Sequence, residues 1–200
     1  MQALDRAAMW TGWPLTEWGR LQLARLGEWL AEEAIAAGGL GPNEAGRIEE
    51  RHLADSILFA RGWDPPDPPS TLVDLGSGVG LPGLPLAILW PETRVTLVDR
   101  SRRRVTLARR AIRILDLGNV EAVCDEAGAV SGGFDMVVAR AAAPPEAVRG
   151  WGLRLLSPGG TMVIGGSHRA PPEAASGEVV VEVKRGILDR TVWLRMITSS

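Results

Sequence analysis

The feature that most constrains the fold is an alternation of short apolar runs and helical segments between residues 71 and 165. The runs are rich in Val, Leu and Ile, and apolar residues recur at helical spacing in the segments between them. This alternation is typical of βαβ units, in which helices cover a parallel sheet. We predict strands over 71–75, 94–99, 120–124, 134–140 and 161–165, and helices over 82–90, 101–117 and 144–156.

The C-terminal part breaks this alternation. Two β-rich runs, 178–186 and 190–197, are separated only by Ile-Leu-Asp. Such a short connection predicts an antiparallel hairpin at one edge of the sheet. Parallel strands followed by a hairpin are the layout of class I S-adenosylmethionine-dependent methyltransferases. We therefore predict an α/β protein with a Rossmann-like, doubly wound sheet of this class.

The first 62 residues are predicted to be helical. One helix is expected from Thr16 to Ala37 and another from Asn43 to Gly62. Residues 63–70 contain four prolines, which exclude a helix or a central strand and predict a stiff linker. The predicted organisation is an N-terminal helical cap over residues 1–62 and a cofactor-binding domain over 63–200. The tryptophans of the cap are expected to pack against the sheet rather than to stack on bases, namely Trp10, Trp13, Trp18 and Trp29.

Composition excludes several classes of protein. The chain has 200 residues, of which 46% are hydrophobic and 23% charged, so a packed core is expected and general disorder is excluded. The single cysteine, Cys124, excludes a disulfide framework and a cysteine-based zinc site, and no metal is expected. No apolar run reaches the roughly 18 residues of a membrane span, and the N-terminus does not resemble a secretory signal. We expect a soluble, cytoplasmic protein, with a monomer favoured.

A glycine-rich loop follows the first predicted strand, in the sequence VDLGSGVGLPG over residues 73–83. Glycines at alternate positions let the backbone turn tightly and approach a cofactor. Residues 78–83 also fit the dinucleotide pattern G-x-G-x-x-G, but this frame begins late after the strand and contains Pro82. S-adenosylmethionine has no pyrophosphate, and its ammonium group suits an acid at the strand end. The predicted cofactor residues of this loop are Asp74, Gly76, Ser77, Gly78, Gly80 and Leu81.

Two further segments complete the predicted cofactor site. Asp99 ends the second strand, where a carboxylate can accept hydrogen bonds from both ribose hydroxyls, and Arg100 follows it. The alternative role for Asp99 is a cap on the next helix. After the third strand, Ala127 and Gly128 are expected beside the adenine, in the segment that begins at Asp125 and Glu126.

Four segments resemble one known family. RHLADS (51–56), VDLGSGVGLPGLPLAI (73–88), VTLVDRSRRRV (95–105) and FDMVVARAAAP (134–144) are similar to the RsmG (GidB) family. The resemblance implies an S-adenosylmethionine-dependent enzyme that methylates guanine N7 in 16S ribosomal RNA of the small subunit. It also implies cofactor contacts from Gly76, Leu81, residues 127–128 and Arg140, with Asp99 on the ribose.

The chain departs from the family pattern at three places. An Asn-Leu-Thr stretch of the family is missing from AAGGLGPNEA (36–45), Gly165-Gly166 stands where the family often has Lys-Gly, and Gly128 replaces an acid. Two alternatives therefore stay open, a methyltransferase for a small molecule or protein and a cofactor-binding protein without catalysis. A nicotinamide-dependent dehydrogenase is disfavoured by the loop frame and by the lack of a paired catalytic His or Tyr.

The expected reaction needs no general base. Guanine N7 carries a lone pair and no proton, so methyl transfer to it is a direct displacement that depends on alignment. The chain has only two histidines, His52 and His168, and no evident pair of nucleophile and base. Arg140, at the end of the fourth strand, is the candidate positioning residue for cofactor or nucleotide. An ordinary ion pair is the alternative role for Arg140.

Two groups of residues are candidates for substrate binding. His52 and Asp55 share one face of the second predicted helix. The alternative is that Asp55 forms an ion pair with Arg51, four residues before it, and that His52 is a structural histidine whose hydrogen bonds are satisfied. The second group is Arg102, Arg103 and Arg104, within a run of seven arginines between residues 100 and 113. Such a patch can bind a phosphate backbone even though the net charge of the chain is −2, and a solvated helix face is the alternative. The predicted partner is ribosomal RNA or the small ribosomal subunit.

Overall fold

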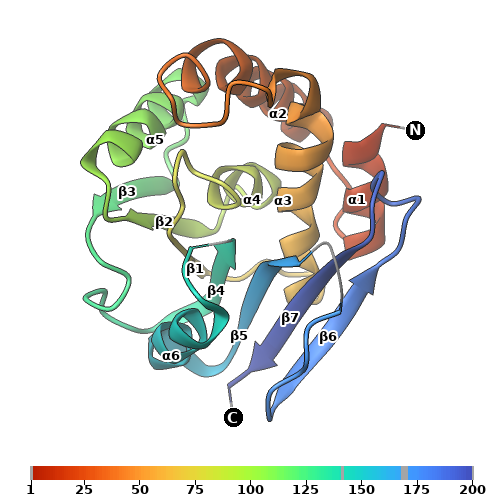
Figure 1. The fold of residues 1–200 in the computed structure, drawn as a ribbon, viewed down its shortest axis with the longest axis vertical. Helices are drawn as coiled ribbons and strands as arrows, with labels where there is room; N and C mark the ends of the chain where they lie inside the picture. The colour runs from red at the N-terminus through yellow and green to blue at the C-terminus, as the bar shows by residue number, and fades with distance from the viewer. Residues whose placement is uncertain (1, 141, 168–170, 200) are drawn as a thin grey trace.

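A computed structural model describes residues 2–140, 142–167 and 171–199, which are arranged around one seven-stranded sheet (Figure 1). The strands are β1 (Thr71–Leu75), β2 (Arg94–Asp99), β3 (Val120–Cys124), β4 (Phe134–Arg140), β5 (Leu156–Ser167), β6 (Glu178–Val183) and β7 (Val192–Thr198). Their order is β3-β2-β1-β4-β5-β7-β6. Strands β1 to β5 pair in parallel, and β7 pairs antiparallel with both β5 and β6. The predicted sheet and its terminal hairpin are confirmed.

Both faces of the central strands are buried, which explains why they read as nearly continuous apolar runs. In β1, Leu72 belongs to one hydrophobic cluster and Val73 to the other, as the alternation of side chains requires. The helices that follow the strands are α4 (Gly83–Leu89), α5 (Arg102–Leu115) and α6 (Pro145–Leu155). The Ser101 side chain caps α5 by accepting a hydrogen bond from the backbone of Arg104.

The N-terminal region is helical but more broken than predicted. It holds α1 (Ala3–Thr11), which was not singled out, and α2 (Glu17–Trp29), whose start is capped by Thr16 as expected. The remaining segments are η1 (Leu30–Ala34), η2 (Ala45–Arg47), η3 (Ile48–Ala54), α3 (Asp55–Ile57) and η4 (Leu58–Gly62). The predicted helix over 43–62 is thus a chain of 3₁₀, π and α turns. Turns of these types share the same apolar spacing over a few residues, so periodicity does not distinguish them.

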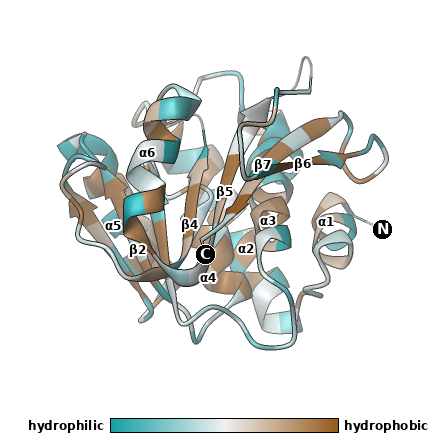
Figure 2. Ribbon diagram, turned by 90° about the horizontal axis from the view of Figure 1, so that it is seen from below, coloured by the Kyte–Doolittle hydropathy of each residue, from teal (hydrophilic) through white to brown (hydrophobic). Residues whose placement is uncertain are grey.

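The two faces of the sheet are covered differently. The N-terminal helices, α4 and α5 form one hydrophobic cluster with strand residues such as Leu72, Leu97 and Val138. On the other face, Val148 and Leu155 of α6 pack against strand residues. Figure 2 shows the apolar strands of the interior and the polar outer surface of α6. The helical cap therefore shares one core with the sheet.

Three of the four cap tryptophans pack as expected. Trp29 is buried, and Trp10 and Trp13 pack partly buried against the same core, where Trp13 lies edge-to-face on Trp90. Trp18 is 42% exposed, contrary to the prediction, because it lies on the outer face of α2. The predicted linker 63–70 contains no helix or strand. No helix within the described residues is long and apolar enough to cross a membrane.

Candidate active site

The glycine loop folds against the carboxyl end of β2. The backbone amides of Gly76 and Ser77 donate to the Val98 carbonyl at 2.8 and 3.0 Å. Gly76, Gly78 and Gly80 all have positive φ values, of 69°, 59° and 103°, which only glycine adopts without strain. A Cβ atom on Gly76 would lie 2.4 Å from the Cβ of Ala142. The loop thus requires glycine both for its conformation and for its close approach to the segment after β4.

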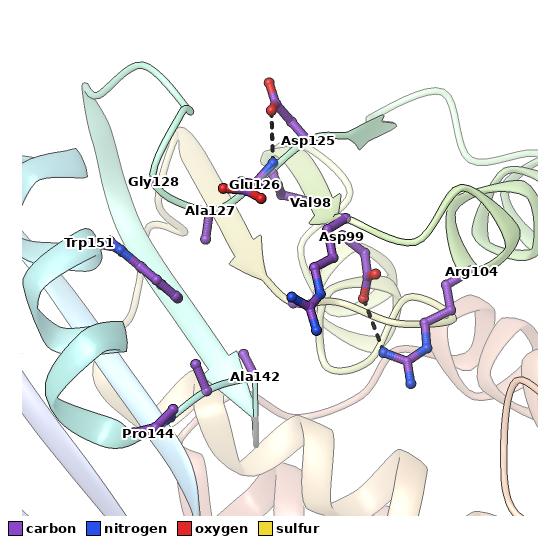
Figure 3. Close-up of a pocket in the computed structure, with 13 residues that line it drawn as sticks. Val98, Asp99, Arg104, Asp125, Glu126, Ala127, Gly128, Ala142, Pro144 and Trp151 are labelled. Atoms are coloured by element: carbon purple, nitrogen blue, oxygen red, sulfur yellow. Dashed lines mark hydrogen bonds and ion pairs between the residues drawn. The ribbon is translucent and has the colours of Figure 1, made fainter.

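A cavity of about 510 Å³ opens between this loop and α6 (Figure 3). It lies beyond the carboxyl ends of β1 and β2, where open α/β sheets bind ligands. Its lining consists of Gly76, Val98, Asp99, Arg100, Arg104, Asp125, Glu126, Ala127, Gly128, Ala142, Ala143, Pro144 and Trp151. The predicted cofactor residues Gly76, Asp99, Arg100, Ala127 and Gly128 are thus brought together at one cavity.

Asp99 is the best-positioned polar group of this cavity. Its side chain is only 4% exposed, and its Oδ2 and Oδ1 accept hydrogen bonds from the backbone amides of Gly78 at 2.9 Å and Ser101 at 2.8 Å. Arg104 Nη1 lies 3.6 Å from Oδ2. The carboxylate is therefore held at the end of β2 and fixed by the glycine loop. Its bond to Ser101 also holds the residue that caps α5, so Asp99 supports the start of this helix without being its cap and lines the cavity as well.

The other predicted loop residues lie outside the cavity lining, namely Asp74, Ser77, Gly78, Gly80 and Leu81. Asp74 is fully buried, and its Oδ2 accepts a hydrogen bond of 2.7 Å from the Gly83 amide, while Oδ1 is buried without a hydrogen-bond partner. Burial raises the pKa of Asp74 to about 7, although the Gly83 amide and the nearby Arg140 oppose the rise. Asp74 thus joins β1 to the start of α4.

Arg140 also lies outside the cavity lining and forms a buried ion-pair cluster with the helical cap. Its Nη1 lies 3.1 Å from Asp55 Oδ2 and 3.4 Å from Ser56 Oγ. The other oxygen of Asp55 pairs with Arg190 Nη2 at 3.2 Å, from the connection between β6 and β7. Asp55 therefore pairs with Arg140 and Arg190 rather than with Arg51, and the alternative i,i+4 pair is absent from the described residues.

His52 lies next to this cluster on the same helical turn. Its Nε2 is 3.0 Å from Glu44 Oε2, and its Nδ1 is buried without a partner. Burial and, secondly, the positive charge of Arg140 lower the pKa of His52, while Glu44 acts in the opposite direction. His52 is therefore a largely neutral imidazole at pH 7.

Comparison with known proteins decides the family. The model of the GidB family, rRNA small subunit methyltransferase G, matches residues 21–193. The chain belongs to the GidB family. It is 42% identical over 156 residues to the ribosomal RNA small subunit methyltransferase G of Mycobacterium leprae strain TN, covering 74% of this chain and 62% of that protein. The corresponding Mycobacterium marinum protein is 38% identical over 169 residues, covering 82% and 72%. This chain thus spans slightly less than two thirds of the length of the M. leprae relative.

Solved structures confirm the fold of this GidB-family chain. A ribosomal protein L11 methylase from Lactobacillus delbrueckii superposes with a TM-score of 0.59 at 17% identity, covering 75% of this chain and 80% of the other. A precorrin-6y C5,15-methyltransferase from Geobacter metallireducens gives a TM-score of 0.52 at 16% identity, covering 72% and 87%. At these identities the likeness concerns the fold alone.

The predicted arginine patch of this GidB-family protein is not uniform. Arg103 donates to the Ala37 carbonyl of the cap, and Arg104 lies beside Asp99 in the cavity. Arg109 donates to the Ala122 carbonyl and Arg110 pairs with Glu33. Arg102 is exposed and has no ion pair or side-chain hydrogen bond with the described residues. The patch thus contains arginines that bind other parts of the protein and one, Arg102, without such a contact among the described residues.

Several lining residues were missed from the sequence. Trp151 reaches the cavity from α6 and lies beside Gly128, where a Cβ atom would come 3.5 Å from its Nε1. Its spacing from the core residues Val148 and Leu155 was the available signal, since all three share one side of α6. Ala142, Ala143 and Pro144 end the family-like segment 134–144, but no pattern indicated that they line the cavity, because that depends on how the chain leaves β4. His168 lies outside the described residues, and the described residues contain no cluster suited to a metal ion.

Proposed function

We propose that this protein uses S-adenosylmethionine to methylate guanine N7 of 16S ribosomal RNA in the small ribosomal subunit. The observation that carries the proposal is the cavity at the ends of β1 and β2, with the fixed carboxylate of Asp99 beside the glycine loop. The curated relatives, named ribosomal RNA small subunit methyltransferase G, support the choice of substrate. The proposal implies a cytoplasmic protein, because small ribosomal subunits are found there.

The residues of the cavity fit the proposed cofactor. Asp99 offers a carboxylate that can accept hydrogen bonds from ribose hydroxyls. Val98, Ala127 and the Trp151 ring provide apolar walls for an adenine. The backbone at Gly76 carries no side chain, so it can approach the methionine part closely. When bound, S-adenosylmethionine would supply a methyl group activated by the positive sulfur.

Besides binding the cofactor, the protein must align guanine N7 with the methyl group. Guanine N7 needs no deprotonation, and the neutral His52 and buried Asp74 are not required as bases in this proposal. Arg140 is held rigidly by Asp55 and Ser56 at the carboxyl end of β4. We assign it the role of positioning the target nucleotide or the cofactor, through the guanidinium donors that these two residues leave free. Holding the reacting atoms in line supplies much of the rate of such a displacement.

Exposed arginines supply the proposed contact with the RNA backbone. Arg100 is exposed and lines the cavity, Arg102 is exposed at the start of α5, and Arg103 lies between α5 and the cap. Their charge attracts phosphates although the whole chain carries a net charge of −2. We infer that an assembled small subunit, which presents a shaped RNA surface, is a better substrate than bare RNA.

A second candidate function is cofactor binding without catalysis. It is favoured by Gly165-Gly166 and Gly128, which stand where the resembled family often has a lysine and an acid. Under this alternative the cavity would bind S-adenosylhomocysteine, but no methyl group would reach RNA.

The test combines binding and transfer. Purified protein is titrated with S-adenosylhomocysteine by calorimetry and incubated with labelled S-adenosylmethionine and either small subunits that lack the modification or bare 16S RNA. We expect binding and transfer of label to the subunits. Binding without transfer to either RNA substrate would favour the second function.

The variant Asp99→Ala is expected to weaken S-adenosylhomocysteine binding by about tenfold or more, because a hydrogen bond to a charged group is lost. A matched control is Asp64→Ala, whose carboxylate is 89% exposed on the linker. Unchanged affinity in Asp99→Ala would remove this residue from the proposed cofactor site.

A further inference from the structure

A second cavity, of about 370 Å³, lies next to the cavity of Asp99. Ala142 and Ala143 line both, so the two spaces meet at the segment that follows β4. The second cavity is bounded by the ends of β4 and β5, the start of α6, and Trp193 and Arg195 of β7. Its volume falls in the range of about 300–1,000 Å³ typical of ligand sites. A group bound there would reach the junction of the two cavities.

The alternation of β7 places Trp193 and Arg195 on this face of the sheet. Leu194, between them, belongs to the core beneath the cap. Ile197, two residues beyond Arg195, belongs to the cluster of α6. Residues i and i+2 of a strand share a face, so an aromatic ring and a guanidinium are neighbours along one wall. The rest of the wall is mostly small or apolar, and includes Ala139, Val148 and Ile164.

Arg195 is held in place by a buried carboxylate. Its side chain is 12% exposed, its Nε lies 3.1 Å from Glu178 Oε2, and its Nη2 donates to the Glu173 carbonyl at 2.7 Å. The side chain of Glu178 is fully buried, and its Oε1 also lies 3.3 Å from Arg149 Nε. Two arginines share one carboxylate, so the cluster retains a positive charge. Nη1 of Arg195 has no acceptor among the described residues.

We propose that the second cavity receives the guanine that accepts the methyl group, with its ring against Trp193 and its O6 facing Nη1 of Arg195. This inference rests on the proposed function and names residues that select the acceptor base. Nη2 donates to the Glu173 carbonyl and Nε faces the Glu178 carboxylate at 3.1 Å, so the Nε–Nη2 edge of the guanidinium is turned toward these groups and Nη1 is left to contact the base. A bidentate arginine would bind O6 and N7 together and block the nucleophile. A single contact to O6 recognises guanine and leaves the N7 lone pair free.

Aromatic stacking supplies the other part of the proposed recognition. A tryptophan ring offers a large apolar face to any base, and stacking alone does not distinguish bases. Selection for guanine therefore depends on Arg195, whose donor matches the O6 carbonyl but repels the amino group of adenine at the same position. The two residues therefore have separable roles: Trp193 provides affinity for the base, and Arg195 selects guanine.

The experiment compares Trp193→Ala, Trp193→Phe and Arg195→Lys by steady-state methylation of unmodified small subunits and by S-adenosylhomocysteine calorimetry. Trp193→Ala is expected to lower kcat/KM by about tenfold or more, and Trp193→Phe to retain most of it, because stacking persists. All three variants should bind S-adenosylhomocysteine within about twofold of the unchanged protein. The matched controls are Trp18→Ala and Arg94→Lys, both at exposed positions remote from the cavity lining.

A second measurement keeps the inference separate from the proposed function. Binding of guanosine and adenosine monophosphates is followed by ligand-observed NMR with S-adenosylhomocysteine present. We expect the unchanged protein to bind the guanosine nucleotide more tightly than the adenosine nucleotide. Trp193→Ala should lose binding of both nucleotides, and Arg195→Lys should bind the two equally. Full methylation by Trp193→Ala and Arg195→Lys would overturn the inference while leaving the proposed function intact. Failure of the unchanged protein to methylate any small subunit would instead contradict the proposed function.

Discussion

At the scale of single residues, the most unusual group is the carboxyl of Asp74. It lies between β1 and α4 with no exposed surface, and only one of its oxygens has a hydrogen-bond partner. Burying an ionised carboxylate without a charged partner costs free energy, and this burial raises the pKa of Asp74 to about 7. The acid was predicted to serve the cofactor directly. Its position beneath the glycine loop instead allows it to fix the loop against α4.

Replacement of Asp74 tests whether its pKa is raised, through the pH dependence of the free energy of unfolding. The folded protein binds a proton at Asp74 that the unfolded chain releases at its ordinary pKa, so this group lowers stability as pH rises from about 4 to about 7. Asp74→Asn removes the ionisation. We expect the free energy of unfolding of Asp74→Asn, relative to the unchanged protein, to increase by on the order of 2–4 kcal/mol between pH 4 and pH 8.

Urea unfolding at several pH values measures this difference, with Asp64→Asn at an exposed position as the control. A difference between Asp74→Asn and the unchanged protein that stays constant with pH would show that Asp74 ionises normally in the folded state.

At the scale of elements, the sheet could be predicted from the sequence, whereas the turns of the cap could not. The strands and the hairpin follow from apolar runs and short connections, since both faces of the sheet are buried. The glycine loop and Asp99 follow from the place where β1 and β2 end. The π and 3₁₀ turns of the cap, Trp151 and the Asp55 cluster depend on contacts between distant segments, which local spacing does not encode.

The Asp55 cluster joins three elements, because it connects the cap with β4 and with the connection between β6 and β7. Asp55→Ala would leave Arg140 and Arg190 without their shared partner in a largely buried place. We expect a loss of about 2–4 kcal/mol in the free energy of unfolding, close to the cost of breaking a buried ion pair. Asp64→Ala, which breaks the exposed pair with Arg61, should cost less than about 1 kcal/mol.

Chemical unfolding of the two variants and the unchanged protein at pH 7 would measure both changes. Equal effects of the two variants would contradict a stabilising role for the cluster.

Helix α5 is the element proposed to follow the RNA backbone. The double variant Arg102→Gln, Arg103→Gln should weaken binding to small subunits and reduce the salt slope of binding by about 1–2, since each lost phosphate contact lowers it by about 0.7–0.9. The single variant Arg94→Gln, at an exposed position on the opposite end of β2, is the control. Filter binding at several salt concentrations gives the slopes. An unchanged slope in the double variant would exclude these two arginines from the RNA contact.

At the scale of the whole molecule, the cap and the sheet act as one unit. Residues 1–62 and 63–200 remain our proposed division into a cap and a cofactor-binding domain, yet leucines of the cap lie in the same hydrophobic cluster as those of the strands. Charge is uneven over this single body, since a net charge of −2 coexists with seven arginines between residues 100 and 113. We therefore expect binding to RNA to depend on orientation rather than on overall charge.

The shared core predicts one cooperative unfolding transition for the whole chain. Urea titrations followed by tryptophan fluorescence and by far-ultraviolet circular dichroism should give coincident curves, because tryptophans lie in the cap and beside the sheet alike. Two separated transitions would show that the cap folds independently of the sheet.

The central claim concerns which atom of the RNA receives the methyl group. The most direct test is to incubate the protein with S-adenosylmethionine and unmodified small subunits, digest the 16S RNA to nucleosides, and identify the methylated nucleoside by mass spectrometry. The account predicts 7-methylguanosine, formed by the unchanged protein and strongly reduced in Asp99→Ala. Methylation at any other atom, or none with subunits while S-adenosylhomocysteine binds, would contradict it.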